Sequence, residues 1–449
     1  MPDILGLSSR TALTLERCAR IAALCALWIA ASPAAGAARR HYDVDYRVEF
    51  LPREGVAAVT IALEPHGGRA SRLRLQMDPK RYAQVRGDGR VVREGDRVTW
   101  EPPAAGGALR YRYKIDHQRR SGGFDARITA DWVIVRGDDL VPRASVRATR
   151  GADSRARLRF VLPTGWHVNT PHALTLDRRA LVVVDPRRRF DRPVGWIIAG
   201  ALGTRREHIG DTWLNVSGPA SHDVRRNDVV AFANAAFPQM KRAFGALPPK
   251  LLVVSAGDPM WRGGLSGPRS LFLHAGRPLF SENGTSSLMH ELTHVITRIR
   301  GAPGDDWIAE GLAEYYAIEL PRRAGLLTAR RFEKALAWMQ HFSQRVDRLG
   351  ARRASGRITA RAVLLLHDLD REIEARSDGA RDLDDVTRAL IPIRRVSLED
   401  LRAVAEHLTG APSQVLASPL LQAPASRAQR GEAERRSNGL GRGAAPVSR

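Results

Sequence analysis

The chain has 449 residues, with 71 Lys and Arg against 48 Asp and Glu, which gives a formal net charge of +23 at neutral pH. Its hydrophobic content of 43% is enough to build the cores of two or three domains and excludes a wholly disordered chain. The positive charge contains no dense basic block with interleaved aromatic residues, which argues against a nucleic-acid partner. We interpret it as solvated surface, with electrostatic contact to an anionic envelope as the alternative.

The first predicted element is a signal peptide over residues 1–37. An apolar run over residues 21–31 follows two arginines, and residues 35–37 read Ala-Gly-Ala, a small-residue cleavage pattern. The run is too short to cross a bilayer, so we expect no transmembrane span after cleavage, with an uncleaved anchor as the alternative. Cys18 and Cys25 both lie in this segment, so the mature chain would hold no disulfide. These features predict an exported, periplasmic or secreted bacterial protein.

Residues 38–204 are predicted to form a β-rich N-terminal domain. Apolar residues alternate with charged ones from Tyr42 to Phe50 and again from Leu109 to Ile115, and Gly-rich turns separate the runs. Many short strands with one apolar face indicate an antiparallel β-sandwich or curved sheet. The scattered histidines of this half are interpreted as surface or core residues. Strands are expected at residues 42–50, 56–63, 73–77, 97–100, 109–115, 132–135, 158–162 and 181–184.

Residues 205–423 change in character and are predicted to form a second domain of mixed type. A helix is expected over residues 227–244, with Asn227 as its cap and Pro238 kinking or splitting it. Strands are expected at residues 251–255 and 270–274. Further helices are expected at residues 328–349, 359–375, 383–390 and 398–408. The fold class is therefore α+β, mainly helical at its C-terminal end, followed by a disordered basic tail over residues 424–449.

The stretch from residue 286 to 316 carries a metal-hydrolase signature. Its first part is His290-Glu291-Leu-Thr-His294. Residues four apart lie on one face of a helix, so the two imidazoles can bind one Zn²⁺ ion. Glu291 lies one step round the helix, where its carboxylate can serve as general base toward a water molecule at the metal. Thr285 or Ser286 can cap this helix, and Gly301 can end it.

The second part of the signature is a Glu-Gly-x-x-Glu helix downstream. Glu310 can supply the third ligand and leave the fourth position open to water, as in catalytic zinc sites. Glu314, one turn further on, is placed to accept the second N–H of a ligating histidine. Asp305 or Asp306 can cap this helix. A strand just before the first helix, over residues 270–274, could form a sheet edge along which a peptide pairs through its backbone.

These residues resemble the gluzincin metallopeptidases, the thermolysin-like class with a Glu as third ligand. Gly263-Gly264-Leu265, the helical segment 360–390 and residues 396–401 narrow the resemblance to the glycyl aminopeptidase family. The resemblance covers most of residues 42–420. It implies a β domain followed by a thermolysin-like zincin catalytic domain, one zinc ion, a peptide or protein substrate and hydrolysis of peptide bonds.

Two positions depart from the pattern of the family. The family and related aminopeptidases often hold a Glu for the substrate's free amine shortly after the Gly-Gly-Leu segment, where this chain has Ser266 and a glycine. Related enzymes also place an oxyanion-stabilising Tyr near the position of Thr359, and no Tyr follows Tyr316 in this chain. His274, Tyr315 or Tyr316 could replace it, although the two tyrosines are equally well explained as packing residues. Gly263, Gly264 and Ser266 are further candidate substrate contacts.

Three hypotheses follow. The first is an exported zinc peptidase that acts as an endopeptidase or with relaxed end specificity. The second is a peptide- or envelope-binding protein on a peptidase fold, with zinc retained and negligible turnover. The third is a basic envelope-binding protein whose Arg-rich surface matters more than its cleft.

Overall fold

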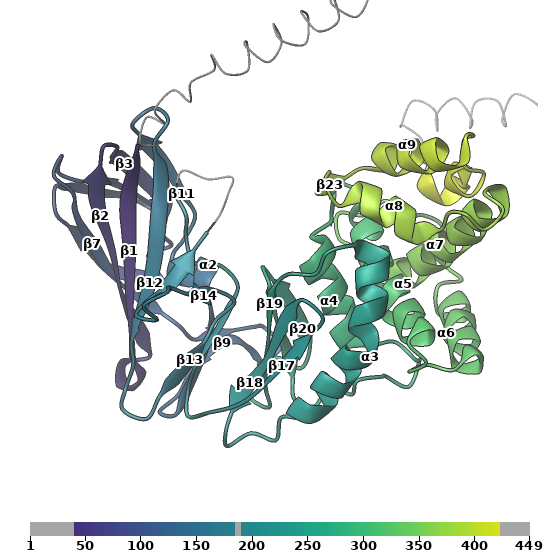
Figure 1. The fold of residues 1–449 in the computed structure, drawn as a ribbon, viewed down its shortest axis with the longest axis horizontal. Coiled ribbons are helices and arrows are strands. Elements are labelled where there is room, and N and C mark those ends of the chain that lie inside the picture. The colour runs from purple at the N-terminus through teal and green to yellow at the C-terminus, as the bar shows by residue number, and fades with distance from the viewer. Residues whose placement is uncertain (1–39, 185–189, 423–449) are drawn as a thin grey trace, which may run out of the picture.

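The computed structural model describes residues 40–184 and 190–422. The predicted signal peptide and basic tail lie outside the described residues. Figure 1 shows a sheet-rich part, coloured purple to blue, beside a second part in which a smaller sheet is followed by helices in green and yellow. The predicted α+β class is confirmed. Among the described residues, no helix is both long and apolar enough to span a membrane.

Two antiparallel sheets face each other across the core of the N-terminal part, one in the order β1-β2-β7-β4 and the other β11-β3-β6-β5. The alternation seen in the sequence explains the pairing, since every second residue of β1 is buried. The strands are β1 (His41–Leu51), β2 (Val56–His66), β3 (Ala70–Gln76), β4 (Tyr82–Gly87), β5 (Arg90–Glu94), β6 (Arg97–Glu101), β7 (Gly107–Lys114) and β11 (Ala144–Ala148).

A small three-stranded sheet, β12-β15-β14, completes the sandwich next to β1. Its strands are β12 (Asp153–Val161), β14 (Ala173–Leu174) and β15 (Leu181–Val183). Ion pairs cross from β12 to β1, with Arg159 Nη1 2.6 Å from Asp45 Oδ1 and Arg157 Nη2 3.7 Å from Asp43 Oδ2. Several arginines of this part are therefore held in pairs on the outer surface.

A five-stranded sheet, β13-β16-β10-β9-β8, joins the two parts, and its central strands β16 and β10 are buried on both faces. Val133 and Ile197 turn to the sandwich core, whereas Ile134 and Trp196 turn to a separate core shared with the second part. Because successive side chains of a strand point to opposite faces, one pair of strands can serve both cores. The strands are β8 (His117–Gln118), β9 (Phe124–Ile128), β10 (Trp132–Arg136), β13 (His167–Asn169) and β16 (Trp196–Gly200), with the short helix α2 (Gly137–Leu140) after β10.

The second part begins with a five-stranded sheet in the order β17-β18-β19-β21-β20. The central strands β18, β19 and β21 are parallel, and β17 and β20 pair antiparallel at the two edges. The predicted domain boundary after residue 204 falls inside β17, which belongs to this sheet. The strands are β17 (Leu202–Ile209), β18 (Thr212–Pro219), β19 (Lys250–Ala256), β20 (Gly264–Gly267) and β21 (Ser270–His274).

Helices cover one side of this sheet and share one large core with it. They are α3 (Arg226–Phe244), α4 (Ser287–Thr297), α5 (Asp306–Arg323), α6 (Ala329–Phe342), α7 (Arg357–Arg376), α8 (Leu383–Leu390) and α9 (Leu398–Thr409). The short strands β22 (Arg300–Gly301) and β23 (Arg395–Val396) pair beside them, and single 3-10 turns occur at η1 (Pro52–Glu54), η2 (Val415–Ala417) and η3 (Pro419–Leu421).

Two details of α3 differ from the sequence prediction. The helix continues through Pro238 as one element, because buried side chains on both sides of the proline, Phe237 and Met240, hold it against the core. Its N-cap is Arg225, which makes no side-chain capping bond, and Asn227 already lies inside the helix. The predicted cap at Asn227 is therefore wrong, and of the two predicted effects of Pro238, a kink or a split, the split is excluded.

Candidate metal centre

The first ligand pair lies on α4, whose start is that predicted. The Ser286 side chain accepts a hydrogen bond from the Met289 backbone N–H. The helix ends at Thr297, earlier than the predicted stop at Gly301, because Arg298 adopts a left-handed conformation with φ 55°. The buried stripe of α4 packs into the core of the second part. The opposite face therefore presents His290 and His294 together.

The other ligand comes from α5, which packs against α4. The acidic residues at its start do not cap it; Asp305 Oδ2 accepts from Leu398 N at 3.1 Å and Asp306 Oδ2 from Ala354 N at 2.9 Å, so they bind neighbouring segments to the helix. Within the helix, Glu310 and Glu314 lie one turn apart and face α4. Two segments separated in sequence thereby bring four polar side chains together.

The three predicted ligands converge. The Nε2 atoms of His290 and His294 are 3.1 Å apart, and each lies 3.5 Å from a carboxylate oxygen of Glu310. In a tetrahedral site with metal–ligand bonds of about 2.0–2.1 Å, ligand atoms stand about 3.3 Å apart. Among the described residues, these three form the cluster of His, Cys, Asp and Glu side chains that could hold a metal ion. The donor set and its spacing therefore fit Zn²⁺.

Glu314 orients the first histidine. His290 Nδ1 lies 2.8 Å from Glu314 Oε2, so Nδ1–H donates to the carboxylate and Nε2 is left free to bind the metal. Burial lowers the pKa of His290, but hydrogen bonds and charges from Glu310, Glu314 and Glu291 outweigh it and raise the pKa to about 10. Burial raises the pKa of Glu310, but the two histidines hold it well below its usual range. The site thus strongly favours positive charge at its centre.

Glu291 lies against the edge strand β20. A β-carbon added to Gly264 would stand 2.7 Å from Glu291 Cγ and 3.0 Å from its Oε1, so the strand passes close to this side chain. Any side chain at position 264 would have to displace it. Gly264 therefore lies beside Glu291, and its role as a substrate contact stays a prediction. Gly263 is also constrained, because a β-carbon there would collide with the Trp261 ring at 2.1 Å.

The free edge of the sheet belongs to β20, not to the strand 270–274 that the sequence indicated. That strand, β21, lies inside the sheet between β19 and β20. His274 N donates to Gly263 O at 3.0 Å, and hydrogen bonds alternate along an antiparallel pair, so Gly264 and Ser266 turn their N–H and C=O groups away from β21. Ser266 also shares the side-chain face of Gly264, toward α4. Ser266 therefore lies two residues along the strand from the glycine beside Glu291.

The candidate oxyanion donors lie elsewhere. Tyr315 is 1% exposed and its hydroxyl donates to Asp370 at 2.5 Å, and the hydroxyl of fully buried Tyr316 lies 3.0 Å from Asp384 Oδ1. Both hydroxyls are directed at α7 and α8, because a step of one or two residues beyond Glu314 rotates the side chain off the face that meets α4. Both tyrosines are thus packing residues, which corrects the assignment of Tyr315 to substrate contact. Thr359 is buried on α7.

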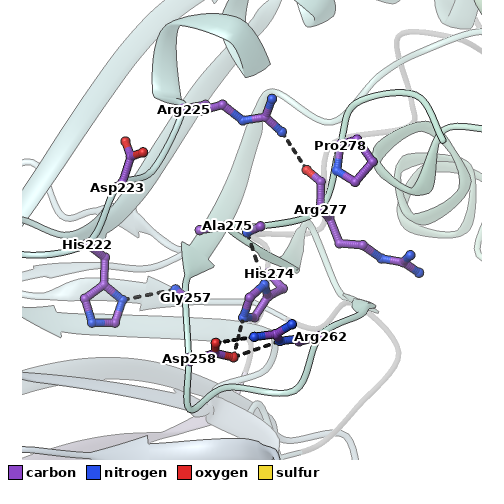
Figure 2. A pocket seen from close by; sticks show the side chains of 11 residues that line it. His222, Asp223, Arg225, Gly257, Asp258, Arg262, His274, Ala275, Arg277 and Pro278 are labelled. Carbon is purple, nitrogen blue, oxygen red and sulfur yellow. Dashed lines mark hydrogen bonds and ion pairs between the residues drawn. The ribbon is translucent and has the colours of Figure 1, made fainter. Parts of the chain in front are cut away.

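His274 does not join the metal cluster either. It is buried at the end of β21, where Nδ1 accepts from Gly276 N at 3.1 Å and Nε2 lies 3.4 Å from Asp258 Oδ1 without hydrogen-bond geometry. Burial lowers the pKa of His274 despite the nearby Asp258 charge. The ring is therefore neutral near neutral pH, with its proton on Nε2. Its side chain lines a neighbouring pocket (Figure 2).

Sequence reasoning missed the contribution of the N-terminal part to this region. Trp196 of β16 donates from Nε1 to Leu265 O at 2.9 Å and from its backbone N–H to Ser270 Oγ at 2.8 Å, which ties β16 to both β20 and β21. The Arg119 guanidinium stacks 3.8 Å from the centre of the Trp261 ring. Nothing in the spacing of these residues indicates such contacts, because they join segments far apart in the chain.

Comparisons with known proteins show the fold. A scan against protein-family models finds no match, and a search of curated proteins finds no relative. Solved structures do match. An aminopeptidase N family protein from Idiomarina loihiensis has a TM-score of 0.56 and 13% identity over 78% of this chain and 70% of its own. A two-domain M1 zinc metallopeptidase mutant bound to L-arginine has a TM-score of 0.54 and 16% identity, covering 86% of this chain and 94% of its own.

A third neighbour agrees with these two. The M1 zinc metallopeptidase from Deinococcus radiodurans has a TM-score of 0.50 and 17% identity over 86% of this chain and 94% of its own. At such low identity the shared property is the fold, which these M1 zinc metallopeptidase structures have in common with this chain. The narrower resemblance to glycyl aminopeptidases stays a prediction.

Proposed function

We propose that the chain is an exported zinc peptidase in which Glu291 is the general base. The observation that carries the proposal is the convergence of three side chains beside a carboxylate close to a strand edge. The two histidine Nε2 atoms are 3.1 Å apart, and each lies 3.5 Å from one of the two carboxylate oxygens of Glu310. The neighbouring folds are those of zinc peptidases, which agrees with a peptide substrate. One ion suffices, because the other predicted carboxylate, Glu314, is engaged by His290 Nδ1.

We assign the following chemical roles to the groups of the site. When bound, Zn²⁺ would polarise the scissile carbonyl and lower the pKa of a water molecule at the open fourth position. Glu291 takes up the proton of that water and later passes it to the leaving amine. Gly264 and Ser266 offer backbone N–H and C=O groups that pair with the peptide and align its scissile bond with Glu291.

End specificity depends on the position of Ser266. A neutral hydroxyl there cannot form an ion pair with a free amino terminus, as a carboxylate would. We therefore propose endopeptidase action or relaxed end specificity. The test uses zinc-loaded protein and a peptide mixture with free or acetylated amino termini, and mass spectrometry locates the cuts. Equal cutting of both versions supports the proposal, whereas cutting of the free version alone would mean that another group binds the amine.

A second candidate function is peptide binding with negligible turnover. Two observations favour it: Ser266 stands at the predicted amine position, and both candidate tyrosine donors are buried in the core. Removing one oxyanion donor typically lowers the rate by about 10²–10³-fold. The Glu291→Gln variant decides between the candidates. Zinc-dependent cleavage that disappears in this variant supports the peptidase, and equal activity in both would contradict the assigned role of Glu291.

Export and envelope contact are also proposals. The sequence of residues 1–37 supports cleavage after Ala37, which the amino-terminal sequence of the mature protein would test. Electrostatic contact with an anionic envelope rests on the net charge of +23. Release from membranes by salt would support that contact, and a salt-independent soluble fraction would contradict it.

A further inference from the structure

A pocket of about 830 Å³ lies at the C-terminal ends of β19 and β21 (Figure 2). Three segments line it. They contribute His222, Asp223 and Arg225 before α3, Gly257, Asp258 and Arg262 after β19, and residues 274–278 from the end of β21 onward. The metal ligands do not line it. Its size is within the range of sites that hold small ligands or a peptide residue.

The edge strand connects this pocket to the reaction centre. Gly264 touches Glu291, the preceding residue Gly263 accepts a hydrogen bond from His274 N, and Arg262 and His274 both line the pocket. One residue of an extended chain advances about 3.3 Å. A peptide that pairs with β20 at Glu291 therefore reaches the pocket within about three residues of its scissile bond.

The charges of the pocket are not balanced. Its lining contains three arginines and two aspartates. Asp258 is already engaged, because Arg262 Nε donates to its Oδ1 at 3.0 Å and His274 Nε2 lies 3.4 Å away. By contrast, Arg225 and Arg277 have no carboxylate within 4.0 Å among the described residues; Arg225 Nη2 donates instead to the Arg277 backbone oxygen at 2.7 Å.

We propose that this pocket is a specificity subsite that takes a carboxylate of the peptide, with Arg225 and Arg277 as its binding residues. The carboxylate can come from an acidic side chain near the scissile bond or from the carboxyl terminus of the peptide. Guanidinium groups match the planar, bidentate geometry of a carboxylate. This inference rests on the proposed function, because it places the peptide along β20.

The test compares peptides of one scaffold sequence with a single scissile bond. Glu, Gln or Lys is placed at each of three positions on either side of that bond, and the carboxyl terminus is left free or amidated. At one of these positions we expect kcat/KM to be higher for the Glu peptide than for the Gln peptide. At the same position we expect it to be lower for the Lys peptide than for the Gln peptide. If the terminal carboxylate is the source, the free and amidated peptides differ instead. Equal kcat/KM throughout would overturn the subsite.

The double variant Arg225→Gln/Arg277→Gln links any preference to the pocket. One exposed charge pair changes an equilibrium or rate constant a few-fold. Loss of both cations should therefore lower the ratio of kcat/KM between the Glu and Gln peptides about tenfold. The matched control is Arg47→Gln/Arg371→Gln, which removes the same charge from exposed positions on β1 and α7 and should keep the preference. A preference that survives in the pocket variant would overturn the assignment.

A binding measurement separates this inference from the proposed function. If the wild type cuts none of the peptides, the peptidase proposal fails. Fluorescence anisotropy with the zinc-loaded Glu291→Gln variant then compares labelled Glu and Gln peptides. Tighter binding of the Glu peptide that is lost with Arg225→Gln/Arg277→Gln supports the subsite, and equal binding of the two peptides overturns it.

Discussion

The backbone of Gly264 lies so close to Glu291 that a β-carbon at position 264 would stand 2.7 Å from Glu291 Cγ. The carboxylate proposed as general base thus lies against a strand that precedes its own helix. Any side chain at position 264 must displace that carboxylate.

We therefore expect Gly264→Ala to lower kcat by about 10²-fold, because a shift of about 1 Å at a reacting group has an effect of this size. Zinc content should stay unchanged, because the ligands lie on α4 and α5. The control is Gly350→Ala, where the nearest atom to the new β-carbon would be 3.9 Å away. Steady-state kinetics and metal analysis check both variants. Wild-type kcat in Gly264→Ala would contradict the proposed position of Glu291.

Glu314→Gln should weaken zinc binding about 10- to 100-fold, because the charged partner of His290 Nδ1–H is lost. Competition with a chromophoric chelator measures this affinity. The exposed change Glu282→Gln serves as control and should leave the affinity unaltered. Wild-type zinc affinity in Glu314→Gln would show that the 2.8 Å contact does not orient the ligand.

Gly311→Ala should destabilise the protein, although alanine is the better helix former by about 1 kcal/mol. A β-carbon at position 311 would lie 2.8 Å from Ala362 Cβ on α7, and neither atom can rotate away. We expect a net loss of about 1–3 kcal/mol in the free energy of unfolding. Urea unfolding measures it, and the double variant Gly311→Ala/Ala362→Gly should recover part of the loss. Stabilisation by Gly311→Ala alone would mean that α5 and α7 are less tightly packed.

His172 should make the protein less stable in acid. It is fully buried, and burial followed by the charges of Arg269 and Lys250 lowers its pKa from 6.5 to about 3. The unfolded chain therefore takes up a proton that the folded chain excludes as the pH falls from 6.5 toward 3. The contribution of neutral His172 to the free energy of unfolding is fully present above pH 6.5. Below that pH the free energy of unfolding decreases by up to about 1.4 kcal/mol per pH unit.

Urea unfolding of metal-free wild type and His172→Gln between pH 7 and pH 4 tests this effect. Other titrating groups act equally in both proteins, so the difference in free energy of unfolding isolates His172. We expect the free energy of unfolding of the wild type to fall relative to that of His172→Gln as the pH falls. A difference that is constant with pH would mean that His172 binds a proton in the folded state.

The ligand set could be predicted from sequence because it depends on local geometry. A spacing of four residues places His290 and His294 on one helix face in any amphipathic helix, and the Ser286 cap follows from the same local rules. The placement of Glu310 and Glu314 on one face of the second helix could also be predicted, since they are four residues apart. The short link between the two helices then leaves little freedom in how they meet.

Packing decided where the sequence left local alternatives open. Tyr315 and Tyr316 could be oxyanion donors or packing residues, and their hydroxyls bond acidic residues of α7 and α8 in the core. Pro238 favours a break in α3, but the buried residues around it keep the helix as one element. Local propensity is worth about a few kcal/mol at most, and burial of several apolar side chains outweighs it.

The sequence by itself determined the identity and spacing of three candidate metal ligands, the position of Glu291 next to the first of them, and the α+β order of elements. These follow from the helical repeat and from strand alternation, which act over a few residues. Only the tertiary structure decided that β20 forms the free edge, that Gly264 touches Glu291, and that Arg225 and Arg277 meet in one pocket. Those relationships join segments far apart in the chain, and the pairing of strands and the packing of the core set them.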